Sequence, residues 1–171
     1  MTAGGTPEQR LAELGLSVPD VVPPVAAYLP AVRSGDHVYT AGQLPMRDGS
    51  LMLTGKVGDT VTSEQATECA RQCALNAIAA IRLHIEDLSR IRIVKVVAFV
   101  ASTPDFTGQP GVANGASELF GAVFGDHGVH ARSAVGVPVL PLDAPVEVEV
   151  IAEILPEARL LSAQVDQQVQ A

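Results

Sequence analysis

Residues 130–153 read HARSAVGVPVLPLDAPVEVEVIAE, and the rest of the chain is interpreted around this segment. From Val146 to Val150 valine alternates with glutamate, and a period of two indicates a strand with one buried face. The earlier half, from Arg132 onward, is interpreted as a neighbouring strand. A proline-containing loop at 138–145 joins the two halves, so we expect them to pair antiparallel across that loop.

Opposite charges lie on these two expected strands. Antiparallel pairing would bring Arg132 near Glu147. A guanidinium can clamp a carboxylate through two parallel hydrogen bonds, and a carboxylate can orient or deprotonate a water. The pair therefore suits hydrolysis of a small anionic substrate, although an ordinary salt bridge between strands explains the same spacing. Glu149 lies on the same strand face and competes for the catalytic role; if both carboxylates point into one site, one pKa should rise.

The rest of the chain predicts two helices. Residues 62–84 form the clearer one, in which Thr62 caps the first turn and Gln65 bonds back to it. Its apolar residues recur at steps of three and four and are mostly small, so this helix should lie close to a sheet. Residues 110–124 form the second helix, which ends at Gly125.

Three further strands are predicted, at 37–41, 51–54 and 91–101, with a turn at 33–36. The resulting order, β-β-α-β-α-β-β, predicts an α+β fold in which two helices cover one face of a mixed sheet. No further strong helix is available for the opposite face. Oligomerisation is the natural way to cover it.

Three segments are expected along the chain. Residues 1–20 form a loose tail and a short helix, whose start combines a hydroxyl cap, a proline and an acid at Thr6, Pro7 and Glu8. Residues 21–155 form a single domain, and 156–171 form a C-terminal tail. The length of 171 residues is sufficient for one domain with a real core.

The composition excludes several classes of partner. A formal net charge of -8 argues against nucleic acid. Cys69 and Cys73 lack the neighbouring ligands of a zinc site, so we expect buried apolar residues, no metal and no cofactor. There is no N-terminal signal and no apolar run long enough to cross a bilayer, so we expect no membrane partner and a cytoplasmic location.

Several short motifs occur in order between residues 28 and 154: Tyr28, Val38–Pro45 (VYTAGQLP), Asn114, Ala131–Ser133 (ARS), Leu140–Pro141 and Val146–Glu149 (VEVE). Together they resemble the Rid (reactive intermediate deaminase) family, also known as the YjgF-like or endoribonuclease L-PSP family. The resemblance implies a chorismate-mutase-like fold and a homotrimer whose sheets pack into a central barrel.

The resemblance also implies an activity, the hydrolysis of reactive 2-imino acids and enamines, of the 2-iminobutanoate or 2-iminopropanoate type, to 2-keto acids and ammonia. Arg132 would hold the substrate carboxylate, and Glu147 would position water or pass protons. Because the family's pockets lie between subunits, Arg132 would work against Tyr28 of the partner subunit. The resemblance places substrate-binding residues at Tyr28, Ala41, Gly42, Asn114, His130 and Ala134.

Three positions depart from the usual family pattern, namely Ala41 in place of serine, Ala134 in place of cysteine and His130 in place of proline. The two alanines remove polar side chains from the expected pocket, and a less polar pocket favours a different substrate side chain. His130 can donate a proton at neutral pH or make a structural hydrogen bond. The alternatives are a non-catalytic trimer that binds small carboxylates and an endoribonuclease, as the older family name implies.

Overall fold

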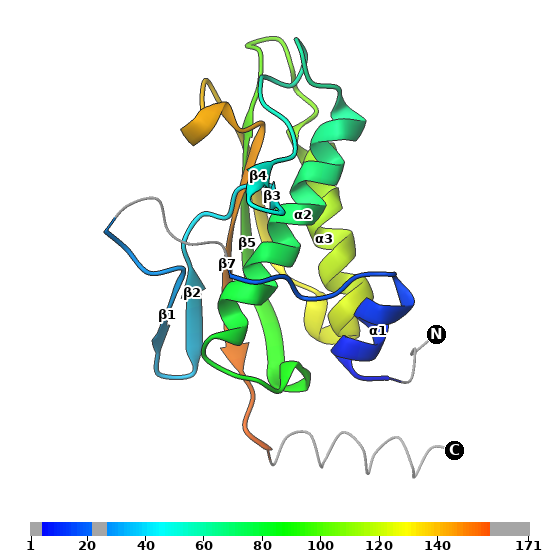
Figure 1. Ribbon diagram of the computed structural model, residues 1–171, viewed down its shortest axis with the longest axis vertical. Helices are drawn as coiled ribbons and strands as arrows, with labels where there is room; N and C mark the ends of the chain where they lie inside the picture. The colour runs from blue at the N-terminus through cyan, green and yellow to red at the C-terminus, as the bar shows by residue number, and fades with distance from the viewer. Residues whose placement is uncertain (1–4, 22–26, 158–171) are drawn as a thin grey trace.

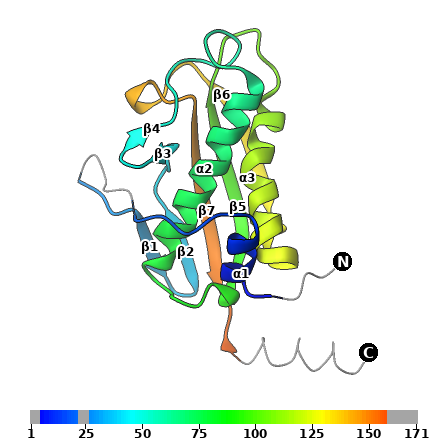
Figure 2. The same cartoon turned by 45° about the vertical axis from the view of Figure 1, so that its right-hand side comes forward.

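The protein is described by a computed structural model over residues 5–21 and 27–157. A five-stranded mixed sheet carries two long helices, α2 (Ser63–Arg82) and α3 (Gln109–Phe124), side by side on one face (Figure 1, Figure 2). The short helix α1 (Pro7–Glu13) packs outside α3, where Arg10 Nη1 donates to the carbonyl of Val123 at 3.1 Å. The predicted α+β class with two helices on one face is therefore confirmed.

The strands of the main sheet follow the order β1-β2-β7-β5-β6. Neighbours are antiparallel except β5 and β6, which are parallel. A separate small hairpin turns through Asp48 and Gly49, both with positive φ. Short 3-10 turns precede β5, follow α3 and precede β7. The strand bounds are β1 Ala31–Ser34, β2 His37–Thr40, β3 Met46–Arg47, β4 Ser50–Leu51, β5 Ile91–Ala101, β6 Ala131–Val137 and β7 Val146–Ile154.

The predicted pairing inside residues 130–153 is wrong. The two strands exist, but β5 lies between them and pairs with both. Val97, for example, faces Ser133 of β6 on one side and Glu149 of β7 on the other. The connection from β5 to β6 runs through α3, and a crossover of that kind delivers a parallel strand, whereas a hairpin delivers an antiparallel one.

The first hairpin also differs from the prediction. The turn expected at 33–36 is narrower, because Ser34 pairs with His37 and only Gly35 and Asp36 lie between the strands. The strand before the turn, β1, was missed because it has only four residues between Pro30 and Gly35, too few to show a period. Of the strand expected at 51–54 only Leu51 lies in a strand, the two-residue β4, which is outside the main sheet.

The two hydroxyl caps that the sequence predicts, Thr6 and Thr62, are confirmed. Each forms a reciprocal capping box, Thr62 with Gln65 as predicted and Thr6 with Gln9. The small apolar face of α2 is buried as expected, at Ala66, Ala70, Cys73, Ala77, Ala80 and Ile81. Small residues let the two helices approach closely: a Cβ on Gly115 of α3 would lie 2.0 Å from the carbonyl oxygen of Thr67 in α2.

The two cysteines lie on this buried face and are unbridged. Burial raises the pKa of Cys73 well above its usual value, and burial likewise raises the pKa of Cys69 to about 11. Both thiols therefore stay protonated and unreactive at neutral pH, as expected of small buried apolar residues.

The face of the sheet opposite the helices is uncovered in the described chain. It carries apolar side chains that remain partly exposed, at Tyr39, Val97, Phe99, Val135 and Ile151. Within residues 5–21 and 27–157, none of the helices combines the length and the apolar character needed to cross a membrane.

The close approach of α2 and α3 predicts opposite effects for two glycines of one helix. Gly115→Ala should lower the free energy of unfolding by about 1–3 kcal/mol, because the new methyl group collides with the backbone of Thr67. Gly121→Ala should raise it by about 0.5–1 kcal/mol, since nothing lies within 4 Å of the new carbon and alanine favours a helix. Denaturant unfolding at fixed protein concentration measures both; equal effects would contradict the helix contact.

Candidate functional site

Arg132 lies on the edge strand β6 and points toward α3. Its Nη1 donates to Asn114 Oδ1 at 2.8 Å and to Ser117 Oγ at 3.0 Å, and its Nη2 donates to the carbonyl of Pro110 at 3.1 Å. Three of the five guanidinium hydrogens are thus used, and no carboxylate within the described chain forms an ion pair with it. The helix holds the cation in place without neutralising it.

A second layer of hydrogen bonds supports this guanidinium. His130 Nδ1 lies 2.6 Å from the carbonyl of Gly128, so Nδ1 donates this hydrogen bond. Nε2 lies 3.0 Å from Ser117 Oγ, which can donate to it while accepting from Arg132. Phe120 packs edge-on against the ring at 5.9 Å. This geometry corresponds to the structural hydrogen bond weighed for His130.

Glu147 lies on the uncovered face of the sheet, against Gly42. A Cβ built on Gly42 would collide with the Glu147 carboxylate, so only glycine permits this contact. Burial raises the pKa of Glu147, and repulsion from Glu149 raises it further. The expected coupling between the two glutamates on one strand face is therefore present, and Glu147 is the member with the raised pKa.

Arg132 and Glu147 do not meet within one protomer. Arg132 pairs with Val96, whose side chain is buried beneath the helices, whereas Glu147 pairs with Phe99 on the opposite face. Paired residues of neighbouring strands share a face, so the guanidinium and the carboxylate point to opposite sides of the sheet. The contact predicted from antiparallel pairing is not made in the described chain, because β5 separates the two strands.

The two alanines that depart from the family pattern also lie apart, one near Arg132 and the other near Gly42. Ala134 pairs with Ala98 on the helix side of β6, two residues after Arg132. Ala41 precedes Gly42, and its N–H donates to the carbonyl of Pro30 at 2.9 Å. The sequence-predicted residues thus form two groups: Arg132, Asn114, His130 and Ala134 beside α3, and Tyr28, Ala41, Gly42 and Glu147 at the end of β2.

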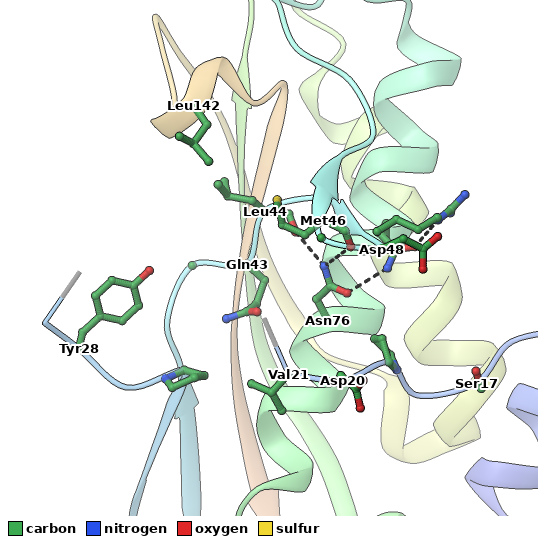
Figure 3. A pocket seen from close by; sticks show the side chains of 16 residues that line it. Ser17, Asp20, Val21, Tyr28, Gln43, Leu44, Met46, Asp48, Asn76 and Leu142 are labelled. Atoms are coloured by element: carbon green, nitrogen blue, oxygen red, sulfur yellow. Dashed lines mark hydrogen bonds between the residues drawn. The ribbon is translucent and has the colours of Figure 1, made fainter. Parts of the chain in front are cut away.

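A cleft of about 730 Å³ opens beside the second group (Figure 3). Tyr28 and Asn76 lie on opposite sides of it, and the side chain of Gln43 projects between them. Gly42 also lines this cleft, so the same residue contacts the Glu147 carboxylate and borders the open space. Backbone bonds in both directions between Gln43 and Val148 fix this segment to β7.

A buried polar network that sequence reasoning missed forms one wall. Asn76 donates both amide hydrogens, to the carbonyls of Leu44 at 2.9 Å and Met46 at 3.0 Å, and accepts from Gln72 at 2.9 Å. Gln72 in turn accepts from Arg47 at 3.1 Å. Two polar residues four apart on an otherwise apolar helix face were the available signal. Sequence reasoning also missed Ser117, which lies three residues after Asn114 on α3. The signal there was again two polar residues spaced to share one helix face.

No metal centre is indicated by the part of the chain that the structure describes, which contains no group of three or more His, Cys, Asp or Glu side chains arranged to hold an ion.

The raised pKa of Glu147 predicts a pH dependence of stability. A carboxyl whose folded pKa lies above its ordinary value of 4.5 stabilises the fold in its neutral form, and this contribution is lost as the pH rises through the folded pKa. The wild type should therefore lose stability relative to Glu147→Gln as the pH rises from 4.5 toward neutrality. Glu149→Gln should remove part of that loss, because it removes the repulsion. Parallel pH profiles of unfolding for wild type and Glu147→Gln would contradict this assignment.

Comparison with known proteins agrees with the fold and with the motifs. The family model described as Endoribonuclease L-PSP matches residues 17–154. A relative called protein TCP17 from Trypanosoma cruzi is 40% identical over 156 residues, covering 90% of this chain and 98% of the relative. A 2-iminobutanoate/2-iminopropanoate deaminase from Dermatophagoides farinae is 32% identical over 140 residues, covering 81% of this chain and 94% of that protein.

A solved structure extends the likeness to three dimensions. The crystal structure of an Agrobacterium tumefaciens protein of unknown function has a TM-score of 0.82 and 44% identity, covering 86% of this chain and 92% of that one. The matched region includes every strand of the main sheet and both long helices. The resemblance read from the motifs is therefore confirmed, and the chain belongs to the endoribonuclease L-PSP family, also known as the YjgF-like or Rid family.

Proposed function

We propose that this protein hydrolyses reactive 2-imino acids, with their enamines, to 2-keto acids and ammonia. The observation that carries the proposal is the guanidinium of Arg132, held by α3 through three hydrogen bonds and not paired with a carboxylate of the described chain. Two of its N–H donors, one of them on Nε, have no partner there, which is sufficient for a substrate carboxylate. The chain has a net charge of -8, so acidic side chains outnumber basic ones, and yet this fixed cation has no carboxylate partner among the described residues.

The second requirement is a group that moves protons. Water adds to the imine carbon, and its two protons pass in turn from the added oxygen to nitrogen. The carbon–nitrogen bond then breaks as the carbonyl forms, and ammonia leaves. A carboxylate can take the proton from water and return it to nitrogen, most effectively when its pKa is raised toward neutrality. Glu147 has such a raised pKa, and the Gly42 N–H and C=O beside it make no hydrogen bond to the described residues.

The third requirement is assembly. Because Arg132 and Glu147 point to opposite faces of one sheet, a site that uses both must combine two subunits. The uncovered apolar face of the sheet supports a homotrimer with sheets packed into a central barrel, since burying such a face stabilises an oligomer. In this arrangement Arg132 and Asn114 of one subunit meet Tyr28, Gly42 and Glu147 of the partner subunit.

One observation favours a second candidate, a trimer that binds small carboxylates without turnover. Ala41 and Ala134 contribute no polar side chain where many relatives have serine and cysteine, while Arg132 remains able to bind an acid. Endoribonuclease activity, which the family name suggests, has weaker support, because an acidic chain repels phosphates.

The proposal is tested by competition with a chemical trap. A threonine dehydratase generates 2-iminobutanoate, semicarbazide traps it, and the wild type should lower the rate of trapping. Arg132→Ala should lower kcat/KM by roughly 10- to 150-fold, the value of hydrogen bonds to a charged partner. Arg33→Ala, which removes an exposed arginine of β1 bonded only within its own turn, is the matched control. Equal competition by wild type and Arg132→Ala would refute the assignment, and 2-ketobutyrate binding without turnover would favour the binding protein.

The shared site predicts complementation between inactive variants. Arg132→Ala and Glu147→Gln should each lose activity, since each lacks one of the two groups. Refolding the two together should restore it at about a quarter of the sites, where an intact Arg132 meets an intact Glu147 of the partner subunit. A mixture of Arg132→Ala with the double variant contains no Arg132 and should stay inactive. Failure of the first mixture to recover would show that the groups are not shared between subunits.

A further inference from the structure

We infer that the imino acid this protein acts on carries a bulky, mainly apolar side chain, which occupies the cleft between Tyr28 and Asn76. The inference rests on the proposed function and narrows its substrate class. Three observations carry it: the volume of the cleft, its position next to Gly42, and the chemistry of its walls.

The cleft is much larger than a small imino acid requires. 2-Iminobutanoate has seven non-hydrogen atoms, which fill about 210 Å³ at most if each takes ~30 Å³, the share of a water molecule in the liquid. The cleft measures about 730 Å³, which is in the range of sites for considerably larger ligands. A substrate of the smallest type would leave most of this space to solvent.

The cleft lies next to Gly42 and Glu147, the groups assigned to the proposed chemistry. The N–H of Ala41 donates to the carbonyl of Pro30, which joins the segments that lead into β1 and out of β2. Beyond this bond, Tyr28 and residues 42–44 line the cleft. Gly42 stands at this junction, in contact with the Glu147 carboxylate and open to the cleft. A substrate whose imine carbon lies beside Gly42 and Glu147 therefore has the cleft as the adjoining space for its side chain.

The walls combine apolar surface with polar and charged groups, among them Asp20, Arg47 and Asp48. Val21, Leu44, Met46 and Leu142 supply apolar surface, and Tyr28 supplies an aromatic ring that is 44% exposed (Figure 3). The side chain of Gln43 is only 7% exposed, and its Nε2 donates to the carbonyl of Ala41. Its Oε1 accepts no hydrogen bond from the described residues, so it remains available to a donor on a ligand, such as a hydroxyl or an indole N–H.

The wall of the cleft at Asn76 is preformed, and the side chain of Asn76 is not available to hydrogen-bond a ligand. Both amide hydrogens of Asn76 and its oxygen are used within the protein, and these bonds fix the carbonyls of Leu44 and Met46. A wall held in this way keeps its shape without a ligand, which lowers the entropic cost of binding a large side chain.

The experiment compares imines of increasing size in one assay. A D-amino-acid oxidase with catalase converts D-alanine, D-methionine, D-phenylalanine and D-tyrosine to their imines, which carry no stereocentre at the reacting carbon. Semicarbazide traps each imine, and the competition by the protein gives kcat/KM. We expect the phenylalanine and tyrosine imines to be hydrolysed at least about tenfold more efficiently than 2-iminopropanoate.

Filling the cleft tests whether it sets this preference. Met46→Trp should lower the ratio of kcat/KM for the phenylalanine imine to that for 2-iminopropanoate by about tenfold. Leu142→Trp, at the exposed rim of the cleft, replaces it if the first variant does not fold. Leu83→Trp is the control, since this residue is exposed at the end of α2 outside the cleft, and the ratio should not change.

The outcomes separate the inference from the function beneath it. If 2-iminopropanoate is hydrolysed as efficiently as the aromatic imines, or if the cleft variants leave the ratio unchanged, the inference is overturned and the proposed function stands. If the wild type hydrolyses none of the imines, the proposed function fails and the inference fails with it.

Discussion

β5 pairs with β6 on one edge and with β7 on the other, and this pairing sets where every group of the candidate site can lie. β5 is long and almost continuously apolar, so it can be buried between two strands and beneath the helical layer. Once it occupies the space between β6 and β7, Arg132 and Glu147 cannot lie on adjacent strands. Their side chains then emerge on opposite faces, and chemistry that needs both groups would require a second copy of the chain.

The face that each group occupies follows from local sequence. Valines of β7 point under the helices, and the alternation leaves Glu147 and Glu149 on the other face. Only a glycine at position 42 lets the Glu147 carboxylate lie so close to the neighbouring backbone. The raised pKa is thus the combined product of a strand period, one missing Cβ and a second carboxylate two residues away.

Local signals in the sequence were sufficient for the elements and insufficient for their pairing. The hydroxyl cap at Thr6, the capping box at Thr62 and the span of β5 were predicted correctly, because each depends on residues a few positions apart. The partner of β6 depends on where α3 returns the chain, which no local period encodes. β1 escaped detection because four residues bounded by Pro30 and Gly35 cannot display an alternation.

The same contrast between local signals and long-range pairing applies to the candidate site. Motifs located Arg132, Asn114, Gly42 and Glu147, yet spacing suggested a direct contact that the sheet order forbids. Ser117 and Asn76 were missed because their importance lies in what they hold, a guanidinium in one case and two backbone carbonyls in the other. Such supporting residues become visible only when the helix and the segment it fixes are seen together.

The uncovered face limits what can cover it. Its apolar residues would be stabilised by burial, but Glu149, Glu153 and Lys95 lie among them, and an isolated buried charge is costly. Lys95 Nζ already donates to Ser133 Oγ at 2.8 Å, so part of this cost is met within the sheet. A cover made of the same sheet brings Lys95 along with each pair of glutamates, so carboxylates and ammonium groups can face one another across the interface. Glu153 lies opposite Arg92 of β5, but a purely apolar partner would offer no counter-charge to Glu149. This difference favours the proposal that copies of the chain itself cover this face.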